Sequence, residues 1–577
     1  MMDRDQTMDR NQRMERGEMA DRDGRVDRDG RREDGLGVPG DRGTTRLAAG
    51  LRRVALVACC STPVLAPVHA SSQTLATDDP VLHRIWVEAT ERSEIEPLAQ
   101  VLLDELGPRL TASPQMERAQ AWAVETLEGW GVDARLEEYG TWEGWDRGPS
   151  HVDLISPRVR SLEGRILAWS PGTGGAPVEG GVTYPEGIRS PADWDAFLET
   201  VAGTWVMLSF PQPTCRTDEQ WAEYGLPGSA VAMDAAREAA EEAWERNLAN
   251  AGSEDVRGRD LHAQIEEAGA LGIITSIWPG SYGTTRVFNA YNRATPTFEL
   301  GCEDYGLVYR LAANGQAPVV RLTAEAENLG EIPVFNVIGE IRGTERPDEY
   351  VVLSAHYDSW EGASGATDNG SGSVLMLETM RILRAAYPEP RRTILIGLWS
   401  GEEQGLNGSR AFTEDHPEVV DGLQALWNQD NGTGRVVRLS AQGLVGATPF
   451  LASWMSKVPE EVARHVELQL PGSPGGGGSD YASFVCYGAP AFSLSALSWD
   501  YGSHTWHTHR DTFDKLVFDD LRNNAVLTAS LAYLAADDPA FVDRTRREVL
   551  VGRGGQPVQW PECRPAVRRS TDSSRMQ

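Results

Sequence analysis

Cysteine is scarce in this sequence, with six residues in 577. Two of them, Cys59 and Cys60, lie in an apolar stretch near the N-terminus. The other four are scattered at Cys215, Cys302, Cys486 and Cys563. No two form a CxxC pair, which argues against a zinc site built from cysteines. A disulfide between Cys215 and Cys302 is compatible with the sequence, although spacing alone does not establish it.

Basic residues are also few, with 54 Lys and Arg against 85 Asp and Glu and a net charge of -31. A surface of that sign argues against a nucleic-acid partner, because phosphate recognition needs positive charge. A long apolar run is missing too. The apolar stretch within residues 46–70 is too short to span a bilayer as a permanent helix. We therefore expect no nucleic-acid partner and no membrane span.

Residues 46–70 have the pattern of a signal peptide, with arginines, an apolar stretch, and small residues at Val68 and Ala70 that predict cleavage after Ala70. A second interpretation is lipidation at Cys59, since residues 56–59 resemble a bacterial lipobox. A third is an ordinary buried segment. Residues 1–45 repeat Asp, Arg and Met without apolar periodicity, so they are expected to be a disordered leader or the product of a misplaced start codon. The mature protein is expected to be secreted or periplasmic.

Helical spacing of apolar residues over 80–106 predicts a helix that Gly107 and Pro108 end. Ser113 and Pro114 are typical of a helix start, and this second helix is expected to reach about Gly129. After residue 330, strands alternate with helices, which predicts an α/β fold with a mixed, mostly parallel sheet and helices on both faces. The predicted organisation is an N-terminal part of the main domain at 74–147, a β-rich insert at 148–330, the catalytic domain at 331–540 and a C-terminal tail at 541–577.

Side chains that can bind metal follow four of the expected strands. They are His356 and Asp358 after the first, Glu402 and Glu403 after the second, Asp430 after the third, and His507 in the loop after the last. Asp368 lies in the Gly-rich loop between the first of these strands and its helix. Ligands in such sheets bind beyond the carboxyl ends of the strands. Four strand ends with this chemistry predict one metal site.

Two His and three carboxylates form a mixed N/O ligand set that suits zinc, with manganese or cobalt as alternatives. The two oxygens of Asp368 can bridge two ions. His356 with Asp430 then holds one ion, and Glu403 with His507 holds the other. His504 and His509 are alternatives to His507 in the same stretch.

The remaining acids have separate expected roles. The Asp358 carboxylate is predicted to accept the ring N–H of His356 and fix its tautomer. Glu402 is predicted to be the general base that takes a proton from the attacking water.

The motifs AHYDSWEGASGATDNGSGS, LWSGEEQG, NQDNGTG, GGSDYASF and WHTHRDTFDKL resemble those of the di-zinc aminopeptidase family. The resemblance covers about residues 80–540. It implies a zinc exopeptidase-like fold, an insert similar to a protease-associated domain, and two zinc ions held by His356, Asp368, Glu403, Asp430 and His507. The resemblance also selects His507 among the three histidines. In the family the ligand His lies four residues before a characteristic Asp, and Asp511 corresponds to that Asp here. The resemblance also places Asp480 where the family often has a supporting Asp.

The expected function is that of a secreted di-zinc exopeptidase that hydrolyses short peptides or dipeptides, with Glu402 as the base. Aminopeptidase, carboxypeptidase and dipeptidase action can share these ligands. A peptide is the expected partner, and a homodimer is a further expectation. The alternatives are a non-catalytic receptor-like relative and a glutaminyl cyclase-like acyltransferase. No ligand is missing here, as it is in such receptors, and the cyclases bind a single zinc and lack the insert.

Overall fold

The computed structural model describes residues 77–475, 477–548, 550–551 and 557–572. The expectations for the leader, the signal peptide and Cys59 therefore lie outside the described residues. The described residues belong to one compact unit that runs from Leu75 to the C-terminus. Among the described helices, none is long and apolar enough to cross a membrane.

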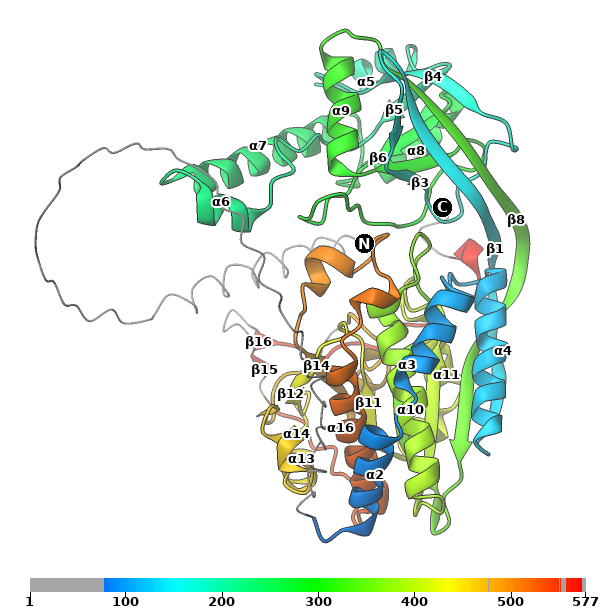
Figure 1. Ribbon diagram of the computed structural model, residues 1–577, viewed down its shortest axis with the longest axis vertical. Helices are drawn as coiled ribbons and strands as arrows, with labels where there is room; N and C mark the ends of the chain where they lie inside the picture. The colour runs from blue at the N-terminus through cyan, green and yellow to red at the C-terminus, as the bar shows by residue number, and fades with distance from the viewer. Residues whose placement is uncertain (1–76, 476, 549, 552–556, 573–577) are drawn as a thin grey trace, which may run out of the picture. The chain divides into compact units, whose positions relative to one another are not determined.

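The first described elements are helices that cover one face of the sheet (Figure 1). The long helix expected over 80–106 is interrupted at residues 92–94, where Glu94 N–H donates to the carboxylate of Glu378 on a neighbouring helix, 3.1 Å away. Ser113 accepts a hydrogen bond from Met116 N–H, so the predicted helix start at Ser113 and Pro114 is confirmed. The elements here are α2 (Pro80–Glu91), α3 (Ile95–Gln100), η1 (Val101–Leu106) and α4 (Pro114–Gly129).

The central strands are parallel, and most of their residues are buried on both faces. β9 (Arg346–His356) pairs in parallel with β10 (Arg392–Trp399) and β11 (Leu423–Asn428), and β11 pairs in parallel with β14 (Ala491–Ala496). Two further strands, β12 (Val436–Ser440) and β13 (Glu467–Gln469), complete this edge. Every residue of β10 and β11 is buried, as parallel strands between helical layers require. The predicted α/β fold with a mostly parallel sheet is confirmed.

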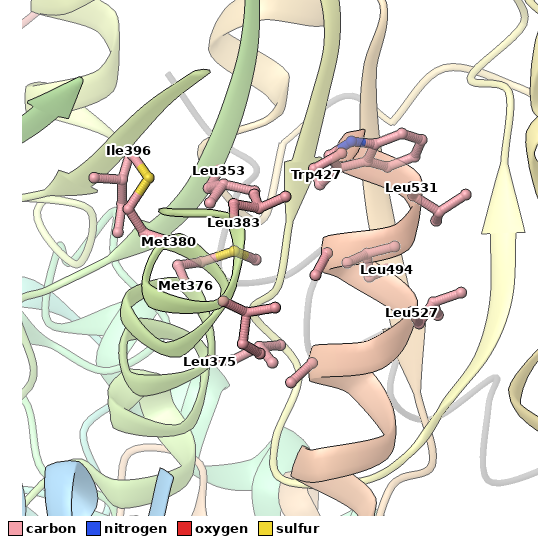
Figure 2. Packing of buried hydrophobic residues seen from close by; sticks show 14 of the residues in the cluster. Leu353, Leu375, Met376, Met380, Leu383, Ile396, Trp427, Leu494, Leu527 and Leu531 are labelled. Atoms are coloured by element: carbon pink, nitrogen blue, oxygen red, sulfur yellow. The ribbon is translucent and has the colours of Figure 1, made fainter. Parts of the chain in front are cut away.

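Helices α10 (Ser371–Ala386) and α16 (Phe518–Asp537) pack on one face of these strands. Figure 2 shows Met376 and Met380 of α10 beside Leu353 and Ile396 of the sheet, with Leu527 of α16 in the same cluster. A second cluster forms on the opposite face of the strands. The other helices after residue 341 are α11 (Asn407–Asp415), α12 (Pro417–Asp421), α13 (Thr448–Met455), α14 (Glu460–Ala463), α15 (Ala482–Val485), η3 (Ala366–Gly370), η4 (Tyr501–Thr505), η5 (Phe513–Lys515) and η6 (Ser570–Asp572).

Two long antiparallel strands connect the catalytic sheet to residues 157–318, the segment of chain that lies between them. β1 (Asp133–Ser156) and β8 (Val319–Ile341) pair along nearly their whole length (Figure 1), and β8 continues the sheet beside β10. We call this pair the ribbon, and residues 157–318 between its strands the insert. The ribbon crosses both boundaries that the sequence suggested for the insert, at 148 and 330.

The insert forms the other end of the same sheet. Parallel strands in the order β4-β5-β6-β7 lie between β8 and β3, with helices around them. Its elements are β2 (Arg160–Leu162), β3 (Gly164–Ile166), β4 (Val178–Thr183), α5 (Pro191–Leu198), β5 (Thr204–Met207), α6 (Asp218–Tyr224), α7 (Ser229–Asn250), η2 (Arg259–Leu261), α8 (His262–Glu267), β6 (Gly272–Thr275), β7 (Thr297–Leu300) and α9 (Cys302–Ala313).

Four cysteines form two disulfides. Cys215 pairs with Cys302 inside the insert, as the sequence allowed. Cys486 pairs with Cys563, which the sequence did not indicate, and so ties the C-terminal segment to the catalytic sheet. The short strands β15 (Leu550–Val551) and β16 (Pro557–Val558) pair with each other in that segment.

Candidate active site

The predicted metal-binding side chains gather at one rim of the sheet because neighbouring strands end there in register. His356 is the last residue of β9 and pairs with Trp399 at the end of β10. Glu402 and Glu403 lie three and four residues beyond Trp399, and Asp430 lies two residues beyond the end of β11.

Two loops complete the rim. Asp368 lies on η3 at the start of α10, and His507 follows η4.

Asp368 lies between two pairs of potential ligands. Its Oδ1 is 3.4 Å from His356 Nε2, which is itself 3.3 Å from Asp430 Oδ1. Its Oδ2 is 3.1 Å from His507 Nε2, which is 2.9 Å from Glu403 Oε2. The structure therefore brings all five predicted ligands together, in the two pairs expected from the sequence. His504 and His509 lie outside this cluster, with His504 exposed at Ser503 and His509 beside Thr285.

The donor set fits divalent cations. Ligand atoms of His356, Asp368 and Glu403 all lie within 4.8 Å of one another in buried surroundings. Apart from its 3.1 Å approach to His507 Nε2, Asp368 Oδ2 is buried without a hydrogen-bond partner among the described residues. Burial, followed by the charges of neighbouring acids, raises the pKa of Glu402 well above its usual value. So much buried carboxylate is costly unless cations neutralise it, and the mixed imidazole and carboxylate ligands suit zinc.

The charges of the cluster also raise the pKa values of the two histidines. Burial alone would lower the pKa of His507, but the carboxylates of Glu403 and Asp368 raise it to about 9. His356 follows the same balance, with burial opposed by Asp430, Asp358 and Asp368, and its pKa lies well above the usual value.

The acceptor for the His356 ring N–H differs from the prediction. His356 Nδ1 lies 2.9 Å from the main-chain carbonyl oxygen of Asp358 and 3.7 Å from its carboxylate. The carboxylate is fully buried and accepts instead the N–H groups of Glu402 and Glu403, each at 3.2 Å, together with the Thr111 hydroxyl at 3.2 Å. The nearest acceptor to this ring N–H is thus the Asp358 carbonyl oxygen, with the predicted carboxylate farther away. The Asp358 side chain holds the Glu402–Glu403 turn.

Sequence reasoning missed two side chains at the site. Asp511, used above only to select His507, accepts hydrogen bonds from Thr367 N–H at 2.8 Å and Asp368 N–H at 2.9 Å, which fixes the loop of the bridging carboxylate. The pKa of Tyr501 is raised well above its usual value, first by burial and then by the charges of Asp368, Asp430 and Glu403, which places its phenol beside the ligands. Asp511 could have been found in the WHTHRDT motif, whereas nothing in the sequence marks Tyr501.

Asp480 is fully buried near the same acids. Burial, together with the charges of Asp430 and Asp358, raises its pKa to about 7, against a lowering effect of His356. It lies close enough to Glu402 for its charge to raise the pKa of that residue as well.

A small pocket opens beside the His507 half of the cluster. Asp368, Glu403 and His507 lie along it, and Trp360 and Val287 form apolar walls. Val287 belongs to the insert, so the insert contributes to the surroundings of the site.

Comparison with known proteins agrees with this geometry. Residues 336–532 match the profile of peptidase family M28. Carboxypeptidase Q from Bos taurus is 26% identical over 470 residues, which cover 80% of this chain and 89% of that protein.

Two solved structures share the fold. A peptidase M28 precursor from Shewanella amazonensis has a TM-score of 0.59 at 22% identity, over 80% of this chain and 97% of that one. A zinc aminopeptidase from Bacillus subtilis has a TM-score of 0.50 at 16% identity, over 78% and 97%. The expected metallopeptidase is confirmed at this level: residues 336–532 are similar to peptidase family M28, and the curated relatives are carboxypeptidases.

Proposed function

We propose that the protein is an exported exopeptidase that binds two zinc ions and hydrolyses short peptides or dipeptides. The observation that carries this proposal is the position of Asp368, whose two carboxylate oxygens face two separate ligand pairs at 3.4 and 3.1 Å. A carboxylate in this position is suited to bridge two ions about 3.5–4 Å apart.

His356 and Asp430 would hold one ion, and Glu403 and His507 the other, with Asp368 shared. Each ion would then have three protein ligands and keep a position open, as catalytic zinc sites do. Manganese and cobalt remain the alternatives. The chemistry that zinc supplies at such a site is Lewis acidity, which polarises a peptide carbonyl and makes water acidic enough to attack it near neutral pH.

The protein's own groups then act on the proton and the developing charge. Glu402 accepts the proton that the attacking water loses and delivers it to the leaving amine, a role favoured by its raised pKa. Asp358 keeps the Glu402 main chain in place through the 3.2 Å hydrogen bond to its N–H. The Tyr501 phenol lies beside Asp368 and would donate to the carbonyl oxygen as negative charge develops.

The experiment is metal analysis combined with a panel of dipeptides and of peptides blocked at either end. Two zinc ions per chain and release of free amino acids from unblocked dipeptides are expected. Loss of activity on N-acetylation alone identifies an aminopeptidase, and loss on C-amidation alone identifies a carboxypeptidase. Loss on either modification identifies a dipeptidase. A chain loaded with two ions that cleaves none of these peptides would contradict the proposal.

Export is supported by the two disulfides, which persist in oxidising compartments. The mature chain is expected to begin at Ser71, which N-terminal sequencing of secreted protein tests; a lipid on Cys59 would instead support the lipoprotein. The homodimer and the likeness of the insert to a protease-associated domain stay predictions, and light scattering tests the first.

A further inference from the structure

The two histidines of the site are held in different ways. His356 has its Nδ1 within 2.9 Å of the Asp358 carbonyl, the usual support for a histidine that binds metal. His507 Nδ1, in contrast, is buried without a hydrogen-bond partner among the described residues. Its orientation therefore depends on packing.

Three aromatic rings surround the His507 imidazole. Trp506 stacks on it, with ring centres 3.8 Å apart and an angle of 19° between the planes. Phe288 lies edge-on at 5.1 Å and Trp360 at 6.0 Å. Phe288 comes from the insert and also contacts Trp360 and Trp506, at 5.7 and 6.4 Å. One insert side chain thus touches all three other members of this aromatic cluster.

The backbone of His507 also depends on the insert. Its φ of 54° lies in the left-handed region, which residues other than glycine rarely adopt. The carbonyl oxygen of His507 accepts a 2.6 Å hydrogen bond from Val287 N–H, which fixes this conformation. Next to it, Arg286 forms an antiparallel bridge with Thr508. The Arg286 guanidinium lies 4.4 Å from the centre of the Trp506 ring and donates to Gly502 O at 3.0 Å.

Three consecutive insert residues therefore contact the stacked tryptophan, the main chain and the ring of one ligand. Given the two-ion site proposed above, we propose that residues 286–288 position His507, so that zinc binding at the His507–Glu403 half of the site depends on the insert. Within the described part of the chain, we find no such contact at the His356–Asp430 half. Its histidine is fixed by Asp358, from the catalytic domain itself. The two ions should therefore respond differently to a change in the insert.

The test is a zinc titration of the metal-free full chain, with thermal unfolding of the same sample as a check on folding. Phe288→Ala should lower the affinity for one ion by about 10–100-fold, as loss of a group that orients a ligand does, and leave the other ion unchanged. Phe288→Tyr keeps the ring and should bind both ions normally. Phe197→Ala is the matched control, because Phe197 is a half-buried insert aromatic that packs on Trp194, 5.4 Å away.

A double-mutant cycle assigns the lost ion. His507→Ala should weaken the same ion, and adding Phe288→Ala to it should cause no further loss, since both changes act on one ligand. If Phe288→Ala does not fold, Phe288→Leu keeps the apolar volume without the ring and is expected to show the same selective loss.

Normal binding of both ions by folded Phe288→Ala or Phe288→Leu would overturn the inference. So would equal weakening of both ions, or the same loss in Phe197→Ala. A wild-type chain that binds fewer than two ions would instead refute the two-ion site itself, so the two failures are distinguishable.

Discussion

Replacing Asp358 with Asn tests what this buried carboxylate does. Its Oδ1 accepts Glu402 N–H, and its Oδ2 accepts Glu403 N–H and the Thr111 hydroxyl. An asparagine has one acceptor oxygen, which should face the two donors at Glu403 and Thr111. Its amide would then face the N–H of Glu402, so two donors would meet and that N–H would lose its partner.

The magnitude follows from that single lost bond. A buried donor without a partner costs about 1–3 kcal/mol, so the free energy of unfolding of the metal-free chain should fall by about this amount. If the same energy is lost from the positioning of Glu402 in the transition state, kcat should fall by about 10–100-fold, at ~1.4 kcal/mol per factor of ten. His356 should be unaffected, because its Nδ1 bonds the carbonyl oxygen, which Asn retains.

The assay is kcat on a dipeptide, measured with zinc content and with thermal unfolding of the metal-free protein. Thr111→Val is the matched control, since it removes one donor to the same carboxylate and leaves both N–H bonds in place; its kcat should stay near that of the wild type. Asp358→Asn with full turnover would refute the argument. Loss of the ion at His356 in that variant would instead show that the carboxylate orients the histidine.

Three further predictions concern other groups. Glu402→Ala should keep two zinc ions and lose about 10²–10⁴-fold in kcat, as expected for a general base, whereas Glu403→Ala should also lose one ion. Measuring metal content together with turnover separates the two variants. Near-normal turnover of Glu402→Ala would mean that another group is the base, and Asp480 would be the first residue to test. Asp511→Asn should keep its bonds to Thr367 but lose the one to Asp368 N–H, so zinc binding should weaken by about 10–100-fold, and unchanged binding isotherms would contradict this role. Burial raises the pKa of Glu299 to about 8, against the opposing charge of Arg165. In the unfolded chain this carboxyl ionises near its usual pKa, so its burial destabilises the fold increasingly from about pH 4 to 8. Glu299→Gln should therefore raise Tm at pH 8 but not at pH 4.

The part of the site that follows strand ends could be predicted from the sequence. Carboxyl ends of parallel strands share one rim, so His356, Glu403 and Asp430 could be grouped before their distances were known. The start of α4 was equally local, because Ser113 and Pro114 specify it without help from the rest of the chain. Predictions of this kind depend on contacts between near neighbours or on strand order.

Contacts between distant segments could not be predicted in this way. The break in the first helix depends on Glu378, 284 residues away from Glu94. Whether His356 bonds the carbonyl or the carboxylate of Asp358 depends on where the Glu402–Glu403 turn lies, which only the packed structure reveals. Tyr501 and Phe288 approach the ligands from segments whose apolar and aromatic residues look like ordinary core.

The ribbon has a mechanical consequence. Its strands pair from Asp133 with Glu340 to Ser156 with Val319, and so form a continuous beam from the catalytic sheet to the insert. The pairing slips only at four places, three of them between residues 138 and 150. Such irregularities are where a pair of strands bends most easily. Val287 of the insert lines the pocket. If the insert moves to widen that pocket for a bulkier substrate, we expect the ribbon to bend at these register shifts.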